Sequence, residues 1–456
     1  MNETALLAGF ARGKVTPPMG AKIPGYFKTR YSDGIITDLY LQATAFSDGE
    51  TCAIVFSCDT ISIADDAYAL ISSKISECCG IEPEAVYIHA THSHTAFRII
   101  LPPKDDPVYS EFFPFVVSQF CEVSKAAFAD LKPCTMKVAF GKAEGISFNR
   151  RYEMKDGTYK TNPRTGDPDI ARRCGPLDES VQLLRILREG GKEILFVNFG
   201  THPDTVGGTQ YCADWCGYLV DFLRGAFNQN VEAMMLNGAQ GDVNHCDRFL
   251  PAGTVFPKTF IAQKMARVLT GEVLKIYDSA KDIDNGKIFY YREKVVIGKN
   301  AYNPAHLPLA REINEHYQVF LKTGIKDDIL NDPDLRRLDD EGGRAMSIPE
   351  AVRIIANLTP PDTFEFPVSG LQIGPVGFIG IPGEPFTQIG MDTKKDSKLA
   401  LTIVNCLVNG GRGYFPTEDA FAVGGYERST SRFASNCAEI VTEACLKIRT
   451  KMEEKL

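Results

Sequence analysis

The sequence predicts an α/β protein whose core is a mixed or parallel β-sheet with flanking helices. Short apolar runs bounded by turn residues alternate along the chain with longer stretches of helical periodicity. Apolar residues make up 44% and charged residues 24% of the 456 residues, which is typical of globular proteins. No internal repeat or low-complexity linker is visible, so we expect a single domain over residues 1–456.

The first third of the chain follows the order strand, strand, helix, strand, helix. Two apolar runs predict strands at residues 41–47 and 53–59, and a helical pattern follows over residues 64–79. The run at residues 85–89 predicts the next strand, and a helix near residues 111–131 ends just before a proline. Alternation of this kind favours a sheet with helices packed on its faces.

Further apolar runs predict the remaining strands and a final helix. The expected strands lie at residues 136–140, 181–188, 194–200, 233–237, 289–296 and 376–381. The final helix is expected over residues 431–455, with no C-terminal immunoglobulin-like domain after it.

The segment at about residues 300–361 is more polar than its surroundings. It contains charge-rich pieces at residues 326–328 and 336–343, and helical patterns at residues 305–323 and 347–357. We interpret the segment as a helical insertion or lid. A solvated helical decoration is the alternative.

Composition excludes several classes of partner. The formal net charge is −8 and no basic stretch is present, so neither nucleic-acid binding nor stable membrane association is expected. The N-terminus lacks a basic region followed by a long apolar run, and thirteen cysteines form no disulfide framework. These features predict a cytoplasmic protein, a small-molecule substrate and a possible homo-oligomer.

Three of the seven histidines fall within six positions, His89, His92 and His94, directly after an apolar run. If the strand continues through them, His92 and His94 point to the same side, because alternate side chains of a strand share a face. Imidazole is the commonest protein ligand for Zn²⁺ and related ions. The spacing therefore predicts part of a metal centre, in which His89, one residue out of the alternation, is structural.

Two other polar residues stand where an apolar strand ends, His202 after residues 194–200 and Glu384 after residues 376–381. Ligands of open α/β sheets gather at strand ends, so two imidazoles and one carboxylate could meet there. Taken singly, such a histidine often only hydrogen-bonds a loop, and such a glutamate often caps the next helix. The glycine-rich turn at residues 237–245 contains Asp242, which could act as a catalytic base or could cap the N-terminus of the following helix.

Several motifs occur along the chain in an order that resembles the catalytic domain of the neutral, non-lysosomal ceramidase family. They are GKVTPPMG at residues 13–20, ATHSH at 90–94, GDVN at 241–244, PGEPFT at 382–387 and GYFPTEDAFAVGGYE at 413–427. The family carries ATHTH, GDVS and PGEFT at the middle three. Separate motifs in one order are more specific than any single motif.

The resemblance implies a zinc amidohydrolase of the type that cleaves the N-acyl bond of ceramide. By motif position it implies four metal ligands, His92, His202, Glu384 and Tyr414, holding one Zn²⁺ per chain. Mixed nitrogen and oxygen ligands also suit Mn²⁺ or Fe²⁺. Such a metal polarises the scissile carbonyl and lowers the pKa of its bound water toward about 7.

The same resemblance places four further residues at the reaction centre. His94 or Asp242 would carry a proton to the leaving amine, and Tyr426 or Arg150 would stabilise the oxyanion. From the residues alone, Tyr426, like Tyr414, could be a core tyrosine, and Arg150 could form only a surface ion pair.

Two departures from the family pattern bear on the chemistry. Asn244 occupies the position of the family's catalytic serine, and a carboxamide cannot act as an activated hydroxyl. Arg98 and Arg428 stand where the family has small residues. Their guanidinium groups favour a polar or anionic ligand, and we expect Asn244 to line the same substrate-binding site. Asn244 could otherwise merely cap its turn.

The sequence leaves three functions open. The first is a zinc-dependent hydrolase that cleaves a C–N bond of a small polar or anionic substrate with metal-activated water. The second is a metal-dependent lyase or isomerase that stabilises an enolate of a sugar-like substrate. The third is a non-catalytic relative that binds a metal or ligand.

Overall fold

Two β-sheets form the centre of the computed structural model, which describes residues 5–26, 28–324, 330 and 346–456. The larger sheet contains, in spatial order, β14 (Val231–Asn237), β12 (Glu193–Phe199), β11 (Ser180–Arg188), β6 (Lys132–Lys142), β1 (Leu7–Lys14), β3 (Tyr40–Ser47), β4 (Cys52–Cys58) and β5 (Val86–Ala90), with β16 (Lys281–Ile283) paired to β6. The smaller sheet contains β17 (Ile288–Gly298), β18 (Thr363–Ile373), β19 (Val376–Gly380) and β21 (Leu401–Asn405).

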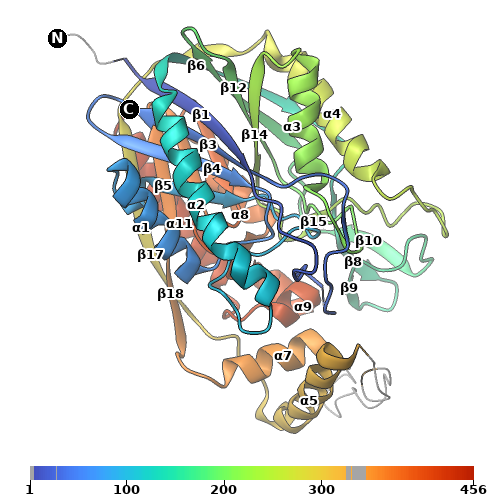
Figure 1. Cartoon of the computed structure of the whole chain (residues 1–456). Helices are drawn as coiled ribbons and strands as arrows, with labels where there is room; N and C mark the ends of the chain where they lie inside the picture. Colours follow the sequence, from blue (N-terminus) through green and yellow to red (C-terminus); the bar gives the residue numbers. More distant parts are fainter. Residues whose placement is uncertain (1–4, 27, 325–329, 331–345) are drawn as a thin grey trace.

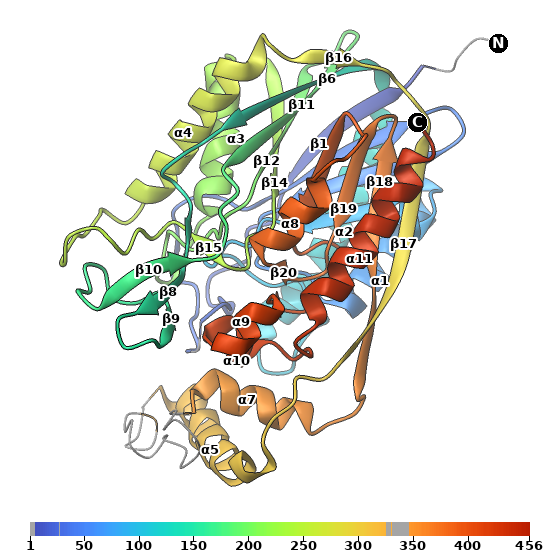
Figure 2. The same cartoon turned by 180° about the vertical axis from the view of Figure 1, so that it is seen from behind.

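The two sheets pack face to face over a shared apolar core. Phe46 and Phe196 of the larger sheet lie in one buried cluster with Phe378 of the smaller sheet. The ring centres of Phe196 and Phe378 are 5.9 Å apart in an edge-to-face arrangement, which aromatic pairs prefer. Helices cover the outer faces of both sheets, so the molecule has four layers, helix, sheet, sheet, helix (Figures 1 and 2).

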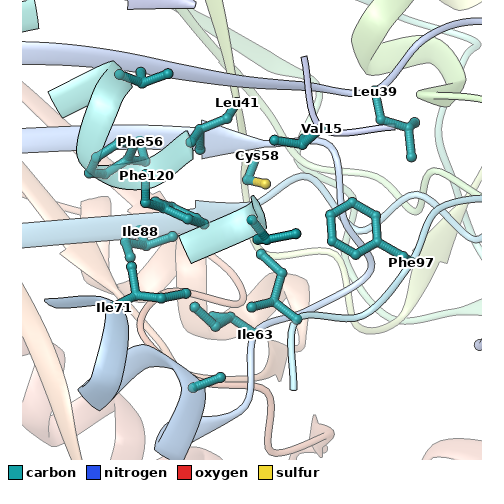
Figure 3. Close-up of a cluster of buried hydrophobic side chains, with 14 of the residues drawn as sticks. Val15, Leu39, Leu41, Phe56, Cys58, Ile63, Ile71, Ile88, Phe97 and Phe120 are labelled. Atoms are coloured by element: carbon teal, nitrogen blue, oxygen red, sulfur yellow. The ribbon is translucent and has the colours of Figure 1, made fainter. Parts of the chain in front are cut away.

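The helices of each outer layer bury the outward-facing apolar side chains of the sheet that they cover. The larger sheet is covered by α1 (Asp65–Cys79), α2 (Pro107–Ala129), α3 (Asp214–Ala226) and α4 (Phe260–Tyr277), and the smaller sheet by α8 (Thr387–Lys394) and α11 (Cys437–Glu453). Figure 3 shows Phe120 of α2 and Ile71 of α1 packed against Phe56 and Ile88 of the larger sheet. The rings of Phe56 and Phe120 are 5.2 Å apart.

The predicted α/β class is confirmed, and the strands predicted from apolar runs coincide with β3 to β6, β11, β12, β14, β17 and β19. The prediction of the last helix was wrong at its start, because α11 begins at Cys437. The Ser431 hydroxyl donates to the Tyr414 carbonyl, and Phe433 forms a β-bridge with Lys299. These tertiary contacts hold residues 431–433 out of the helix.

The helical insertion lies between β17 and β18 and contains α5 (Leu307–Thr323) and α7 (Ile348–Asn357). The two helices share an apolar cluster that includes Ile313 and Ile354, and they lie below the two-sheet body in Figure 1. Helix α7 contacts α10 (Tyr426–Thr430), where Arg353 donates to the Ser429 carbonyl. The charge-rich pieces at residues 326–328 and 336–343 lie outside the described residues.

Across the described part of the chain, the helices are all too short or too polar to cross a bilayer.

The buried carboxyl of Asp59 at the end of β4 predicts a pH-dependent stability. Burial raises its pKa from an ordinary 3.8 to about 7, although the Tyr40 amide donates to it. Between these pH values the folded chain holds a proton that the unfolded chain has lost, so the free energy of unfolding should fall as pH rises. Asp59→Asn should remove this slope and stabilise the protein at pH 8 by up to roughly 4 kcal/mol. Urea denaturation of both proteins at pH 5, 6, 7 and 8 measures it, and parallel pH curves would contradict it.

Candidate metal and catalytic site

The candidate site lies where the carboxyl ends of three parallel strand pairs converge. These pairs are β4 with β5, β12 with β14, and β19 with β21. His92 follows β5, His202 follows β12, Glu384 follows β19 and Tyr414 follows β21. Glu384 and Tyr414 also lie opposite each other in a short parallel pair, β20 (Glu384–Pro385) with β22 (Tyr414–Phe415). Polar residues at strand ends are thereby collected from both sheets.

His92 and His94 do not share a strand face, so that part of the prediction was wrong. Strand β5 ends at Ala90, and His92 adopts a left-handed backbone conformation with φ of 77°. Its amide donates to the Thr60 carbonyl, which holds this turn. The two rings nevertheless meet, with their Nε2 atoms 3.2 Å apart. His89 stays in the strand, and its Nε2 accepts the Asn237 amide.

The two candidate histidine ligands are oriented by main-chain carbonyls. The Nδ1 atom of His92 is 2.7 Å from the Ile61 carbonyl oxygen, and Nδ1 of His202 is 2.8 Å from that of Gln240. A carbonyl can only accept, so each Nδ1 carries a proton and each Nε2 of the neutral ring presents a lone pair. Metal-binding histidines are commonly oriented in this way.

Glu384 brings a further acceptor atom to the same point. Its Oε2 atom is 3.3 Å from Nε2 of His92 and 3.2 Å from Nε2 of His202. Among the described residues, no hydrogen-bond donor reaches this buried oxygen. Burial would favour a neutral carboxyl, but His92 and His202, when they carry a proton on Nε2, hold the pKa of Glu384 well below its ordinary value. With both rings neutral and protonated only on Nδ1, that stabilisation is lost and the Nε2 lone pairs face the carboxylate. An ionised carboxylate facing imidazole lone pairs is repulsive unless a cation lies between them.

The donor set therefore fits a transition metal. It comprises two oriented imidazole nitrogens, a carboxylate oxygen and the hydroxyl of Tyr414, which is 3.4 Å from Nε2 of His202. His94 offers a third nitrogen, because ligand atoms of His92, His94 and His202 all lie within 4.8 Å of one another. Burial, followed by the nearby Arg150, lowers the pKa of His202, which keeps that ring neutral as a metal ligand must be.

Arg150 is the cation nearest to these ligands. Its Nε donates to Glu427 over 2.7 Å, its Nη2 donates to the Gly241 carbonyl over 2.8 Å, and its Nη1 lies 3.2 Å from Nε2 of His202. Both charged side chains are buried, with 4% of Arg150 and 0% of Glu427 exposed. The sequence predicted Arg150 but not Glu427, although the Tyr-Glu pair of the last motif contains it.

A cavity of about 360 Å³ opens onto the histidines. Its walls come from the loop before β2 (Gly34–Ile35), the histidine turn, the Glu384 and Tyr414 segments, and the insertion. The lining residues include Tyr26, Ile61, His92, His94, Arg98, Tyr317, Glu384, Tyr414 and Tyr426. Tyr317 of α5 brings the insertion to the cavity wall.

The two arginines expected to bind substrate lie in different places. Arg98 lines the cavity, is exposed to it, and donates from Nε to the Ser62 hydroxyl over 2.9 Å. Arg428 does not line this cavity, and instead forms an ion pair with Glu350 of α7 over 3.0 Å. Only Arg98 is therefore placed to meet a ligand beside the histidines.

Asp242 and Asn244 are also turned away from this cavity. The Asp242 carboxylate accepts from the amide and hydroxyl of Thr387 and from Asn149, and it lines a separate cavity of about 330 Å³. Asn244 accepts from the Cys246 amide and donates to Asn162, which is the turn-capping arrangement. The structure therefore brings neither side chain to the histidines.

The fold and the site together define a class of protein. It has a two-sheet α/β body in which buried side chains suited to metal binding meet at converging strand ends. Neither a protein-family model nor a curated protein sequence matches the chain. The fold is shared with the neutral ceramidase from Pseudomonas aeruginosa, with a TM-score of 0.72 and 14% identity over 100% of this chain and 75% of that one. A ceramidase complexed with C2 gives a TM-score of 0.71 and 15% identity over 99% and 76% of the two chains. The resemblance to neutral ceramidases is thus confirmed for the fold.

Proposed function

We propose that this protein is a metal-dependent hydrolase that cleaves the C–N bond of an N-acyl substrate, with Zn²⁺ as the metal. The observation that carries the proposal is the meeting of His92 Nε2 and His202 Nε2 with the Glu384 oxygen that lacks a donor among the described residues. The fold shared with two ceramidases favours amide hydrolysis as the reaction. When bound, such a metal would polarise the acyl carbonyl and activate water.

The residues around the ligands have distinct tasks in this proposal. His94 faces His92, and burial is the main cause that lowers its pKa well below the ordinary value and keeps its ring neutral. A neutral ring can take a proton from water and pass it to the leaving amine. Tyr426, which lines the cavity, would supply a hydroxyl to the developing oxyanion. Arg150 lies behind the ligands beside His202, where Glu427 holds it, and would supply positive charge.

Solvent isotopes test the reaction class. Hydrolysis in H₂¹⁸O should place one ¹⁸O atom in the released acid, as mass spectrometry of the products would show. A lyase or isomerase acting through an enolate would instead incorporate deuterium from D₂O onto carbon without adding water. If the metal-loaded protein hydrolysed no N-acyl compound, that result would favour the non-catalytic alternative.

Arg98 predicts a preference for substrates that carry an anionic group. A guanidinium inside a cavity pairs strongly with a carboxylate, and a hydrogen bond to a charged group contributes about 1.5–3 kcal/mol. Arg98→Gln should therefore raise KM for an acidic N-acyl compound about tenfold or more and leave KM for its uncharged analogue nearly unchanged. Steady-state kinetics with the matched pair measure this difference.

Arg428→Gln is the matched control, because Arg428 pairs with Glu350 outside the cavity wall. It should not change the ratio of the two KM values. Equal effects of Arg98→Gln on both substrates would contradict the assignment of Arg98 to anion binding.

A further inference from the structure

Asp204, His245 and Cys246 form a chain of contacts that the proposed reaction does not use. Nδ1 of His245 is 2.9 Å from the Asp204 carboxylate, and Nε2 of the same ring is 3.2 Å from the Cys246 sulfur. Asp204 belongs to the loop after β12, and the other two residues directly follow β15 (Val243–Asn244). The order carboxylate, imidazole, thiol is the arrangement that activates a cysteine nucleophile.

The imidazole of this cluster lies between a carboxylate and a thiol. Burial disfavours the charged ring, but the Asp204 carboxylate, with a further contribution from Cys246, raises the pKa of His245 well above its ordinary value. Side chains of His245 and Asp204 are only 17% and 19% exposed, so water screens their attraction weakly. Outside the cluster, Asp214 acts on His245, and the hydroxyl of Tyr26 acts on Asp204 and Cys246. The rings of His94 and His202 also act on Asp204.

We propose that Cys246 is a nucleophilic thiol and a modification site for soft electrophiles, in particular disulfides of low molecular weight. His245 lies within hydrogen-bond distance of the Cys246 sulfur through Nε2 and can take up the thiol proton, and Asp204 orients the ring by accepting from its Nδ1–H. In the exchange, the Cys246 thiolate attacks one sulfur of R–S–S–R, a Cys246–S–S–R bond forms and the original S–S bond breaks. The departing RS⁻ takes a proton to leave as RSH, so no other oxidant or reductant is needed.

The other twelve cysteines have different surroundings. Seven of the thirteen are buried, while Cys246 is partly exposed. Among the partly exposed ones, burial and then the neighbouring Cys78 raise the pKa of Cys79 to about 12 and that of Cys121 to about 11. Within the described residues, Cys246 has the one hydrogen-bond contact between a sulfur and an imidazole nitrogen. Selective reaction at Cys246 follows from that contact.

Site-resolved labelling of the full chain tests the inference. The folded protein is treated briefly with iodoacetamide, and separately with oxidised glutathione, at pH 6.5, and peptide mass spectrometry gives the rate at each cysteine. Cys246 should react on the order of tenfold faster than the five other partly exposed cysteines, because the adjacent His245 ring can take its thiol proton. The internal references are Cys52, Cys78, Cys79, Cys121 and Cys174.

His245→Gln should reduce the Cys246 rate to that of the references, and Cys246→Ser should remove the modified peptide. Asp204→Asn is a second variant, expected to slow labelling in the same direction because the ring loses its counter-charge. If circular dichroism shows that either variant is misfolded, the test is the ratio of the Cys246 rate to the reference rates in the unmodified protein. A Cys246 rate no higher than the references, or one unchanged in folded His245→Gln, would overturn the inference. Labelling requires no substrate or metal, so this outcome is independent of the hydrolase proposal.

Discussion

His202→Ala and Glu384→Gln are each expected to abolish metal binding and to lower kcat/KM by at least about 10²-fold. Even loss of an outer partner of a metal ligand costs about 10–100-fold in affinity or activity, so loss of a direct donor should cost more. Glu384→Gln keeps the shape of the side chain and removes only its charge, which makes it the sharper test. Elemental analysis should show about one metal equivalent in the unmodified protein and none in either variant.

The matched control removes an imidazole elsewhere. His306→Ala, in the first turn of the insertion, should retain both metal and activity, because His306 does not line the cavity. Dialysis against a chelator should reproduce the loss of activity in the unmodified protein, and added Zn²⁺ should restore it. Retention of a full metal equivalent by both ligand variants would contradict the proposed site.

Glu427→Gln is expected to destabilise the fold and slow the reaction together. Removing one partner of a buried ion pair leaves the other charge uncompensated, at a cost of about 3–5 kcal/mol in the free energy of unfolding. Arg150 would then be held by the Gly241 carbonyl without its counter-charge, so kcat should also fall. Denaturant unfolding and steady-state kinetics measure the two effects.

The control for this variant is Glu365→Gln, which breaks an exposed pair with Lys294 whose side chains are 55% and 66% exposed. That change should cost no more than about 1 kcal/mol. If Glu427→Gln were no more destabilising than the control, the buried pair would have no net role in stability. If it destabilised the protein but left kcat unchanged, Arg150 would be structural only.

Local sequence patterns predicted nine strands of the two sheets and five helices, but they missed β1, α3 and α4. Apolar runs with polar ends located strands such as β4 and β12, because alternation and burial depend on neighbouring residues. They did not reveal that the strands divide into two facing sheets, and β18 and β21 of the smaller sheet were not predicted. Pairing between strands far apart in the sequence depends on long-range packing, which a local pattern does not contain.

The adjacent residues Arg150 and Arg151 show the same limit of prediction from local sequence. Arg150 contacts His202 and Glu427, whereas Arg151 donates to the carbonyls of Ala420 and Gly424. Either arginine satisfied the sequence pattern, and the direction of the backbone at this point decided which one reached the site.

By itself, the sequence determined the chemical nature of the donors and their positions at strand ends. His92, His202 and Glu384 could be identified because each follows a predicted apolar strand, whereas Tyr414 was implied only by the resemblance of its motif to the ceramidase family. Only the tertiary structure decided that these four meet, that Arg98 faces the cavity, and that Asp242 and Arg428 do not. The physical reason is that residue type and local periodicity are properties of neighbours in the chain, whereas side-chain direction and convergence depend on how two separate sheets pack together.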